Sequence, residues 1–311
     1  MHDRNTLPNR IAKAVDQRLA KLFAQNDSLS LIYERCSLAL SPGVRRQPLV
    51  LFQMGRVGSR TLEDSLTGRL NGVRVHHVHF LTEDGQANFN RLYIGNPHFK
   101  GSGLRYVVRN RFLAQQIRST LHKETWQVVT AVRDPIARNI SMFFTMLLAR
   151  WPETNARERF HAGDSDALLR EIIPLFMNEF DHNSALKWFD EEMKAVFDFD
   201  VYSEPFNKVK GYHIYEQDNT RVLLVRLENL NESGVEAFRT FLNLPEFTIR
   251  KTNVAANKDY GPLYQRFVEE IDLPDSYIER MYNSRFARHF YTDSELIGFR
   301  ERWVRNRKPH L

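Results

Sequence analysis

The sequence is nearly free of cysteine. Because Cys36 is the one cysteine in 311 residues, neither an internal disulfide nor a cysteine metal site can form within the chain. Cys36 lies in a stretch with helical spacing, so we expect its thiol to be buried as a small apolar group. A catalytic thiol is not expected, because no pattern that would place a base beside it accompanies this residue.

Long apolar runs are also missing. No window approaches the ~20 apolar residues of a membrane span, and the first residues contain no apolar stretch of signal-peptide length. An acceptor pattern for N-glycosylation begins at Asn139, but it lies inside a binding motif described below, where a glycan would block the site. We therefore expect a cytoplasmic protein without a membrane span.

Repeats, low-complexity tracts, long linkers and a compact metal-ligand set such as H-E-x-x-H are absent as well. No metal is therefore expected. The chain shows no composition shift that would mark a domain boundary. We expect one domain over residues 1–311, with a helical region at 1–45 and a core at 48–303.

What the sequence does contain is typical of a globular protein with an anionic partner. Apolar residues make up 42% and charged residues 26%, and the 22 phenylalanines favour a packed core over disorder. The net charge of +6 suits a nucleotide, an acidic glycan or a nucleic acid, and does not choose among them.

Short apolar runs alternate with helical patterns along the chain. This alternation predicts an α/β fold: a central parallel sheet with helices on both faces and helical additions at both ends. Strands are expected at 49–54, 73–81, 126–133 and 221–227, and helices at 59–70, 110–122, 134–151, 166–180, 184–197, 233–242 and from 263 onward. Residues 83–103 are expected to form a loop, which together with residues 151–166 would recognise the acceptor.

The segment PLVLFQMGRVGSRTLEDSL, residues 48–66, leads from a strand through a glycine turn into a helix. This geometry suits phosphate, because glycine lets backbone N–H groups approach an anion and the helix N-terminus adds partial positive charge. The spacing fits neither the nucleotide P-loop nor the G-x-G-x-x-G fingerprint. A plain turn with a solvated arginine is the alternative. The candidate anion ligands are Arg56, Val57, Gly58, Ser59, Arg60 and Thr61.

A second candidate anion site follows the third expected strand. Arg133 ends this strand, and Asp134 with Pro135 is a typical helix start. Ser141 lies seven residues beyond Asp134, close to two helical turns, so Arg133 and Ser141 can meet one anion. The alternative is that Arg133 pairs with Asp134 while Ser141 bonds its own helix. Two phosphate sites at neighbouring strand ends indicate a nucleotide phosphorylated at both its 5′ and 3′ positions.

Together, GRVGSRTL and VRDPIARNISMFF resemble the motifs of sulfotransferases that use 3′-phosphoadenosine-5′-phosphosulfate (PAPS). The resemblance implies the P-loop-like sulfotransferase fold, with Arg56 in the place of the loop lysine. Arg56 to Thr61 would hold the 5′-phosphosulfate, and Arg133 with Ser141 the 3′-phosphate. Two residues depart from the family pattern: Arg56 replaces lysine, and Arg60 replaces a small hydroxyl residue.

Later segments extend this resemblance. HHVHFL is similar to a strand of glycan 2-O-sulfotransferases, which implies His79 as the base and His77 beside the acceptor, whereas His76 would face away. A packed, hydrogen-bonded histidine pair is the alternative. Glu228 aligns with a glutamate at the end of a strand in this family. The alternative is that Glu228 only caps the next helix or pairs with an arginine. Lys258 lies in a stretch similar to a loop that approaches the nucleotide.

The implied function is transfer of a sulfuryl group from PAPS to a carbohydrate hydroxyl. The chain is most similar to bacterial sulfotransferases associated with capsular polysaccharide synthesis. His79 would take the acceptor proton, and Arg56 with the loop amides would stabilise charge on the leaving phosphate. No nucleic-acid partner is expected. An inactive binder of anionic glycan or nucleotide is the alternative, and a P-loop kinase is disfavoured because Gly-Lys-Ser/Thr is missing.

Overall fold

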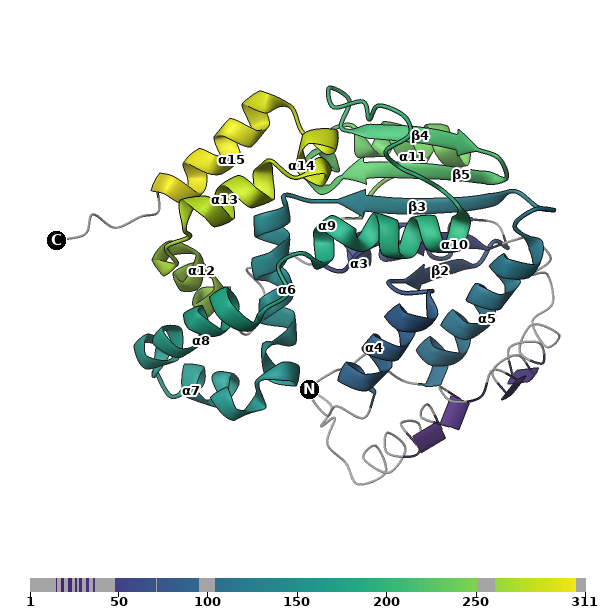
Figure 1. Ribbon diagram of the computed structural model, residues 1–311. Helices are drawn as coiled ribbons and strands as arrows, with labels where there is room; N and C mark the ends of the chain where they lie inside the picture. The colour runs from purple at the N-terminus through teal and green to yellow at the C-terminus, as the bar shows by residue number, and fades with distance from the viewer. Residues whose placement is uncertain are drawn as a thin grey trace.

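A computed structural model describes residues 48–70, 72–94, 104–250 and 261–305, and isolated positions between 15 and 36 (Figure 1). Lys258 and most of the expected helical region 1–45 lie outside the described residues. Cys36 is exposed, which corrects the expectation of a buried thiol. The apolar side chains of Leu22, Ile32 and Tyr33 are exposed in the same stretch, whereas Phe23 packs against Ile94 and Val107.

One five-stranded sheet forms the centre of the molecule, in the order β2-β1-β3-β5-β4. The strands predicted from the sequence are present as parallel neighbours. They are β1 (Leu49–Phe52), β2 (Val75–Val78), β3 (Trp126–Val132) and β5 (Thr220–Arg226). The apolar runs of β1, β3 and β5 reflect burial on both faces; all four residues of β1 are buried. The α/β fold class with a mostly parallel sheet is therefore confirmed.

The sheet also contains a strand that the sequence analysis missed. Strand β4 (Tyr212–Gln217) pairs antiparallel with β5 at the sheet edge, so the central parallel sheet expected from the sequence has one antiparallel edge strand. Its mixed composition, YHIYEQ, matches a half-exposed edge strand rather than a buried apolar run. A tight turn joins the two strands, with Asp218 in a left-handed conformation (φ 45°).

Helices cover both faces of the sheet. Figure 1 shows α5, α9 and α10 on one face and α3 and α11 on the other. The helices around the sheet are α3 (Ser59–Leu66), α4 (Glu83–Tyr93), α5 (Leu104–Thr120), α6 (Pro135–Arg150), α7 (Ala156–His161), α8 (Ser165–Glu179), α9 (Ser184–Trp188), the π-helical turn η2 (Phe189–Lys194), α10 (Ala195–Phe197) and α11 (Gly234–Leu242). Two short 3₁₀ turns are η1 (Pro152–Thr154) and η3 (Leu227–Asn229).

Helix α4 corrects the expected loop at 83–103 over its first eleven residues. The side chain of Thr82 accepts a hydrogen bond from the Gly85 amide, and Glu83 and Asp84 occupy the first turn. These features are those of a capped helix start, in a segment whose glycine and asparagines resemble a loop.

The C-terminal part is helical, as expected, and packs onto the rest through aromatic residues. It contains α12 (Gly261–Glu270), α13 (Asp275–Tyr282), α14 (Arg285–Phe290) and α15 (Asp293–Arg305). Phe267 stacks on Phe143 of α6, and Phe290 contacts Phe189 of η2. One cluster of buried apolar side chains runs from Leu49 to Trp303. Within the described residues, no helix is both long and apolar enough to cross a membrane.

The strand order fixes where a ligand can bind. Strand β1 lies between β2 and β3. The chain that leaves β1 therefore runs toward the β2 edge of the sheet, whereas the chain that leaves β3 runs toward the opposite edge, formed by β4. In open α/β sheets this reversal opens a crevice at the carboxyl ends of the two strands. Both candidate anion motifs begin there.

Candidate functional site

The loop after β1 has the backbone of an anion-binding turn. Arg56 (φ 75°) and Gly58 (φ 88°) both adopt positive φ angles, and Gly58 caps α3 without any side-chain hydrogen bond. Such turns orient successive N–H groups into a concavity, to which the uncapped helix end adds its own. A side chain at Gly58 would also place its Cβ 2.7 Å from Leu227 Cδ1, so glycine is required for two reasons.

The two anion motifs are in direct contact. Arg56 Nε donates to Ser141 Oγ at 2.9 Å, and Arg133 Nη1 donates to the Arg56 carbonyl oxygen at 3.3 Å. Arg56 and Arg133 are half-buried, and Ser141 is buried in the second turn of α6. Arg133 and Ser141, which lie 77 and 85 positions after Arg56 in the chain, therefore form one cationic, hydroxyl-bearing surface with Arg56 at the crevice.

Helix α6 is fixed against this loop. Asp134 Oδ1 accepts from the Ile136 amide at 3.0 Å, which confirms the predicted cap. Arg138 is buried and donates through Nε to the Gly55 carbonyl oxygen at 3.1 Å and through Nη1 to Ser184 Oγ at 2.9 Å. Arg133 and Arg138 thus bind the carbonyl oxygens of two consecutive loop residues and hold the loop to α6.

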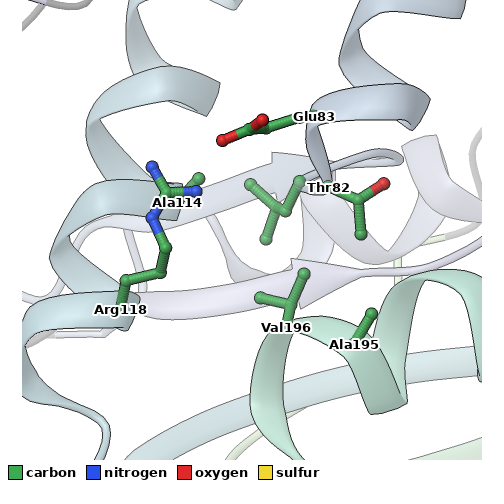
Figure 2. A pocket seen from close by; sticks show the side chains of 7 residues that line it. Thr82, Glu83, Ala114, Arg118, Ala195 and Val196 are labelled. Carbon is green, nitrogen blue, oxygen red and sulfur yellow. The ribbon is translucent and has the colours of Figure 1, made fainter.

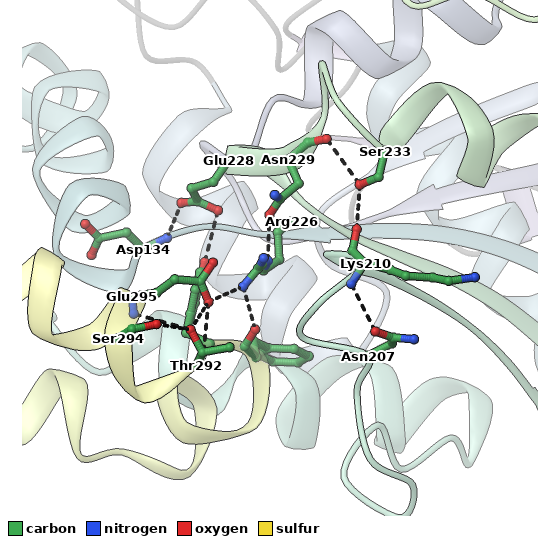
Figure 3. Close-up of polar contacts among 12 residues, drawn as sticks. Asp134, Asn207, Lys210, Arg226, Glu228, Asn229, Ser233, Thr292, Ser294 and Glu295 are labelled. Atoms are coloured by element: carbon green, nitrogen blue, oxygen red, sulfur yellow. Dashed lines mark hydrogen bonds and ion pairs between the residues drawn. The ribbon is translucent and has the colours of Figure 1, made fainter.

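Glu228 links the ends of β3 and β5 (Figure 3). Its Oε1 accepts from the Asp134 amide at 2.7 Å, and its Oε2 accepts from the Tyr291 hydroxyl at 3.2 Å. These partners differ from the helix cap or arginine pair considered from the sequence. Arg226, also shown in Figure 3, is buried and donates to Glu295 Oε2 at 2.7 Å. The carboxyl end of β5 is therefore fixed beside the start of α6.

The histidine strand presents two rings on one side. The rings of His77 and His79 lie edge to face, with centroids 4.7 Å apart, whereas His76 is buried on the opposite side, as expected. His77 Nδ1 lies 3.0 Å from Glu63 Oε2. Because a carboxylate accepts, Nδ1 of His77 is the donor in this hydrogen bond. This hydrogen bond is the main cause of a lowered pKa at Glu63.

Glu63 is not among the site residues predicted from the sequence. It lies on α3, directly after the anion loop, and its contact with His77 spans 14 positions in the chain. The only sign of a role for Glu63 in the sequence is its place on the helix that follows the anion loop. Its contact with His77 depends on the register between α3 and β2, which cannot be read from the sequence.

His79 is held in one tautomer by the backbone. Its Nδ1 lies 2.7 Å from the Gln53 carbonyl oxygen, so Nδ1 donates and Nε2 is the acceptor. Burial is the main cause that lowers the pKa of His79 to about 3. His79 is therefore neutral at pH 7 and less basic than an ordinary histidine, whose pKa is about 6.5.

Several buried polar atoms near the loop have no hydrogen-bond partner among the described residues. They are the Gln53 side-chain amide, Ser59 Oγ and His77 Nε2. Buried polar groups without partners are costly and uncommon. Their position along the loop and the histidine strand fits a polar ligand bound at this crevice, so the residues present are compatible with a phosphorylated donor.

The remaining predicted residues contribute in different ways. Val57 is fully buried, while Arg60 is exposed. Lys258 lies outside the described residues. In the part of the chain that is described, no group of three or more His, Cys, Asp or Glu side chains is placed to hold a metal ion.

A separate pocket lies between the start of α4, α5 and α10 (Figure 2). Its volume is about 200 Å³. Leu81, Thr82, Glu83, Ala114, Arg118, Ala195 and Val196 line it. None of the predicted anion ligands contributes to this pocket, but Leu81 and Thr82 directly follow the histidine strand.

The comparisons with known proteins concern the second half of the chain. Residues 157–292 match the family model NKWYS, described as "Putative capsular polysaccharide synthesis protein". No curated protein and no solved structure matches the chain. The matched segment begins after both anion motifs and includes Trp188, Glu192 and Glu228. It supports a protein related to capsular polysaccharide synthesis.

Proposed function

We propose that the protein transfers a sulfuryl group from PAPS to a hydroxyl group of a carbohydrate acceptor. The observation that carries this proposal is the contact of Arg56 with Ser141 and Arg133 at the crevice between β1 and β3. Two anion-binding motifs that meet at one crevice suit a ligand with two separate phosphate groups. PAPS has its phosphosulfate and its 3′-phosphate on the two sides of one ribose.

The family match supports the acceptor class. A protein related to capsular polysaccharide synthesis acts among sugars, whose hydroxyl groups are the common sulfuryl acceptors. The match covers the helices and strands that lie beside the crevice, including η2 and β5. It does not choose the sugar or the hydroxyl.

The chemistry requires a new bond between the acceptor oxygen and sulfur, while the bond from sulfur to the bridging phosphate oxygen breaks. Arg56 and the N–H groups at the start of α3 would hold the 5′-phosphate as negative charge grows on it. Arg133 and Ser141 would hold the 3′-phosphate. The acceptor proton would pass to a histidine Nε2, and 3′,5′-bisphosphoadenosine would leave.

His79 is the proposed base, with the Glu63–His77 pair beside it. Its low pKa in this structure is an obstacle for proton transfer near neutral pH. Anionic groups bound in the adjoining loop would raise that pKa, because nearby negative charge favours the protonated imidazole. His79 would thus gain basicity when the donor is bound.

The test is incubation with labelled PAPS and a panel of polysaccharides, with mass analysis of the products. We expect a mass increase of one sulfate on one polysaccharide, lost in His79→Gln and Arg133→Ala. Binding of 3′,5′-bisphosphoadenosine without transfer to any acceptor would instead support an inactive binder. If the protein neither bound this nucleotide nor transferred sulfate, the proposal would be refuted.

A further inference from the structure

The end of the histidine strand is held by side chains from one distant helix. Trp188 Nε1 donates to the His79 carbonyl oxygen at 3.0 Å. Glu192 Oε2 accepts from the Leu81 amide at 2.8 Å and from the Thr82 amide at 3.1 Å. Glu192 Oε1 accepts from the Thr82 hydroxyl at 2.6 Å. We call these contacts of Trp188 and Glu192 with residues 79–82 the 188–192 clamp.

The clamp is buried and locally unusual. Trp188 and Glu192 are each 3% exposed. Glu192 lies in the π-helical turn η2, a form that is rare in proteins and frequent at functional sites. Both carboxylate oxygens of Glu192 accept hydrogen bonds from residues 81 and 82, which offset part of the cost of its burial. Burial still raises the pKa of Glu192.

Gly85 makes room for the carboxylate. A Cβ at Gly85 would lie 2.0 Å from Glu192 Oε1 and 2.9 Å from Thr82 Oγ1. Gly85 is inside α4, where alanine would otherwise favour the helix. Glycine at this position is therefore explained by the approach of Glu192 and not by the needs of the helix.

From these contacts we infer that Glu192 and Trp188 are positioning residues, which hold His79 in the orientation that its role in the proposed sulfuryl transfer requires. Neither residue touches the proposed donor site, and they act through the backbone of residues 79–82. This inference rests on the proposed function for the role of His79, but the contacts themselves do not depend on that function.

The surroundings explain why the clamp is needed. The pocket of about 200 Å³ is lined in part by Leu81 and Thr82, so the segment has open space on that side (Figure 2). The charged and titratable groups near the His79 ring are His77, Glu63 and Arg138. Its Nδ1 bonds to the backbone carbonyl oxygen of Gln53. Release of the clamp would let the segment shift toward the pocket and would expose the partly buried His79 ring further to water.

The experiment reads His79 directly by NMR of the histidine ring resonances between pH 5 and 8.5, with the His79 signal assigned through His79→Gln. In the wild type we expect no titration of His79 in this range, since its pKa is about 3. In Glu192→Ala we expect a midpoint within the range, shifted toward the ordinary histidine value of about 6.5. Gly85→Ala, which displaces the carboxylate from the other side, should give the same change.

Three controls make the result specific. Glu191→Gln removes a charge from the same turn. Because Glu191 is exposed, this variant should leave His79 without titration in this pH range. Glu192→Gln keeps an acceptor for the two amides and should largely restore the wild-type behaviour. His182, buried and bonded to the Phe176 carbonyl oxygen and the Tyr277 hydroxyl, serves as the reference for general loosening of the fold.

A silent His79 in both Glu192→Ala and Gly85→Ala would overturn the inference. A change in the titration of His182 that accompanies the change at His79 in these variants would overturn it as well. Binding of 3′,5′-bisphosphoadenosine to the same variants separates this inference from the proposed function. If the variants bind this nucleotide as the wild type does while the titration of His79 changes, both the inference and the proposed function are supported. A wild type that binds no nucleotide would refute the proposed function and would leave the result on His79 intact.

Discussion

The two sides of the candidate site differ in how their residues are connected along the chain. The anion side consists of two short motifs, each continuous in sequence, that begin at the carboxyl ends of β1 and β3. The histidine side depends on single contacts between distant segments, such as Glu192 with Leu81, 111 positions apart. A function carried by a local motif can be read from the sequence, whereas the geometry that supports it cannot.

The largest expected effect is on the anion side. Arg133→Ala removes a cation that can form charge-assisted hydrogen bonds with phosphate, which are worth about 1.5–3 kcal/mol. Affinity for 3′,5′-bisphosphoadenosine, measured by calorimetry, should therefore fall by roughly 10- to 100-fold. Arg60→Ala removes the same charge from an exposed position in the first turn of α3 and should change the affinity much less. Equal losses in the two variants would show that net charge, and not the geometry of the site, determines binding.

The next effect concerns the histidine side and folding stability. Glu192→Ala leaves the Leu81 and Thr82 amides without their acceptor. The free energy of unfolding should drop by about 2–3 kcal/mol, measured by urea denaturation. Glu191→Ala, on the exposed side of the same turn, should stay within about 0.5 kcal/mol of the wild type. Similar losses for both would mean that the helix, and not the clamp, carries the stability.

Acid should weaken the fold through two histidines. The pKa values of His76 and His79 are both lowered to about 3, mainly by burial. Between these values and about 6.5 the unfolded chain binds more protons, so stability falls as the pH falls through this window. Each histidine contributes a slope of up to roughly 1.4 kcal/mol per pH unit.

His79→Gln should therefore reduce the dependence of the unfolding free energy on pH between 6.5 and 4, with His76 still contributing. Urea denaturation at three pH values measures the slope. An unchanged slope in this variant would show that His79 is protonated in the folded protein, contrary to its low pKa.

The smallest effect should come from Glu228→Gln. The glutamine oxygen can still accept from the Asp134 amide, and its NH₂ group can donate to the Tyr291 hydroxyl oxygen after rotation of that hydroxyl. A change of about 1 kcal/mol or less in unfolding free energy is expected. A much larger loss would indicate that the charge of Glu228, and not its hydrogen bonding, holds the ends of β3 and β5 together.

Much of the fold could be predicted, because buried parallel strands are continuous apolar runs and helix α6 begins with a strong cap at Asp134. Strand β4 escaped because an edge strand is mixed in composition, and α4 escaped because its glycine and asparagines resemble a loop. The glycine there is explained by Glu192, which lies more than 100 positions away and which no local pattern could connect to it.

The candidate site divides in the same way. Arg56, Arg133 and Ser141 were found from their spacing, and the structure brings them together. The contact of Glu63 with His77 and the low pKa of His79 depend on the register of α3 against β2 and on packing, neither of which the spacing of residues encodes.

The most direct test of the central claim compares two ligands on one protein. Calorimetry should show that 3′,5′-bisphosphoadenosine binds roughly 10- to 100-fold more tightly than adenosine 5′-phosphate, since the added phosphate would meet Arg133 and Ser141. Arg133→Ala should abolish most of this preference and leave the weaker ligand's affinity nearly unchanged. Equal affinity of the wild type for both nucleotides would contradict the claim that the two motifs hold one doubly phosphorylated ligand.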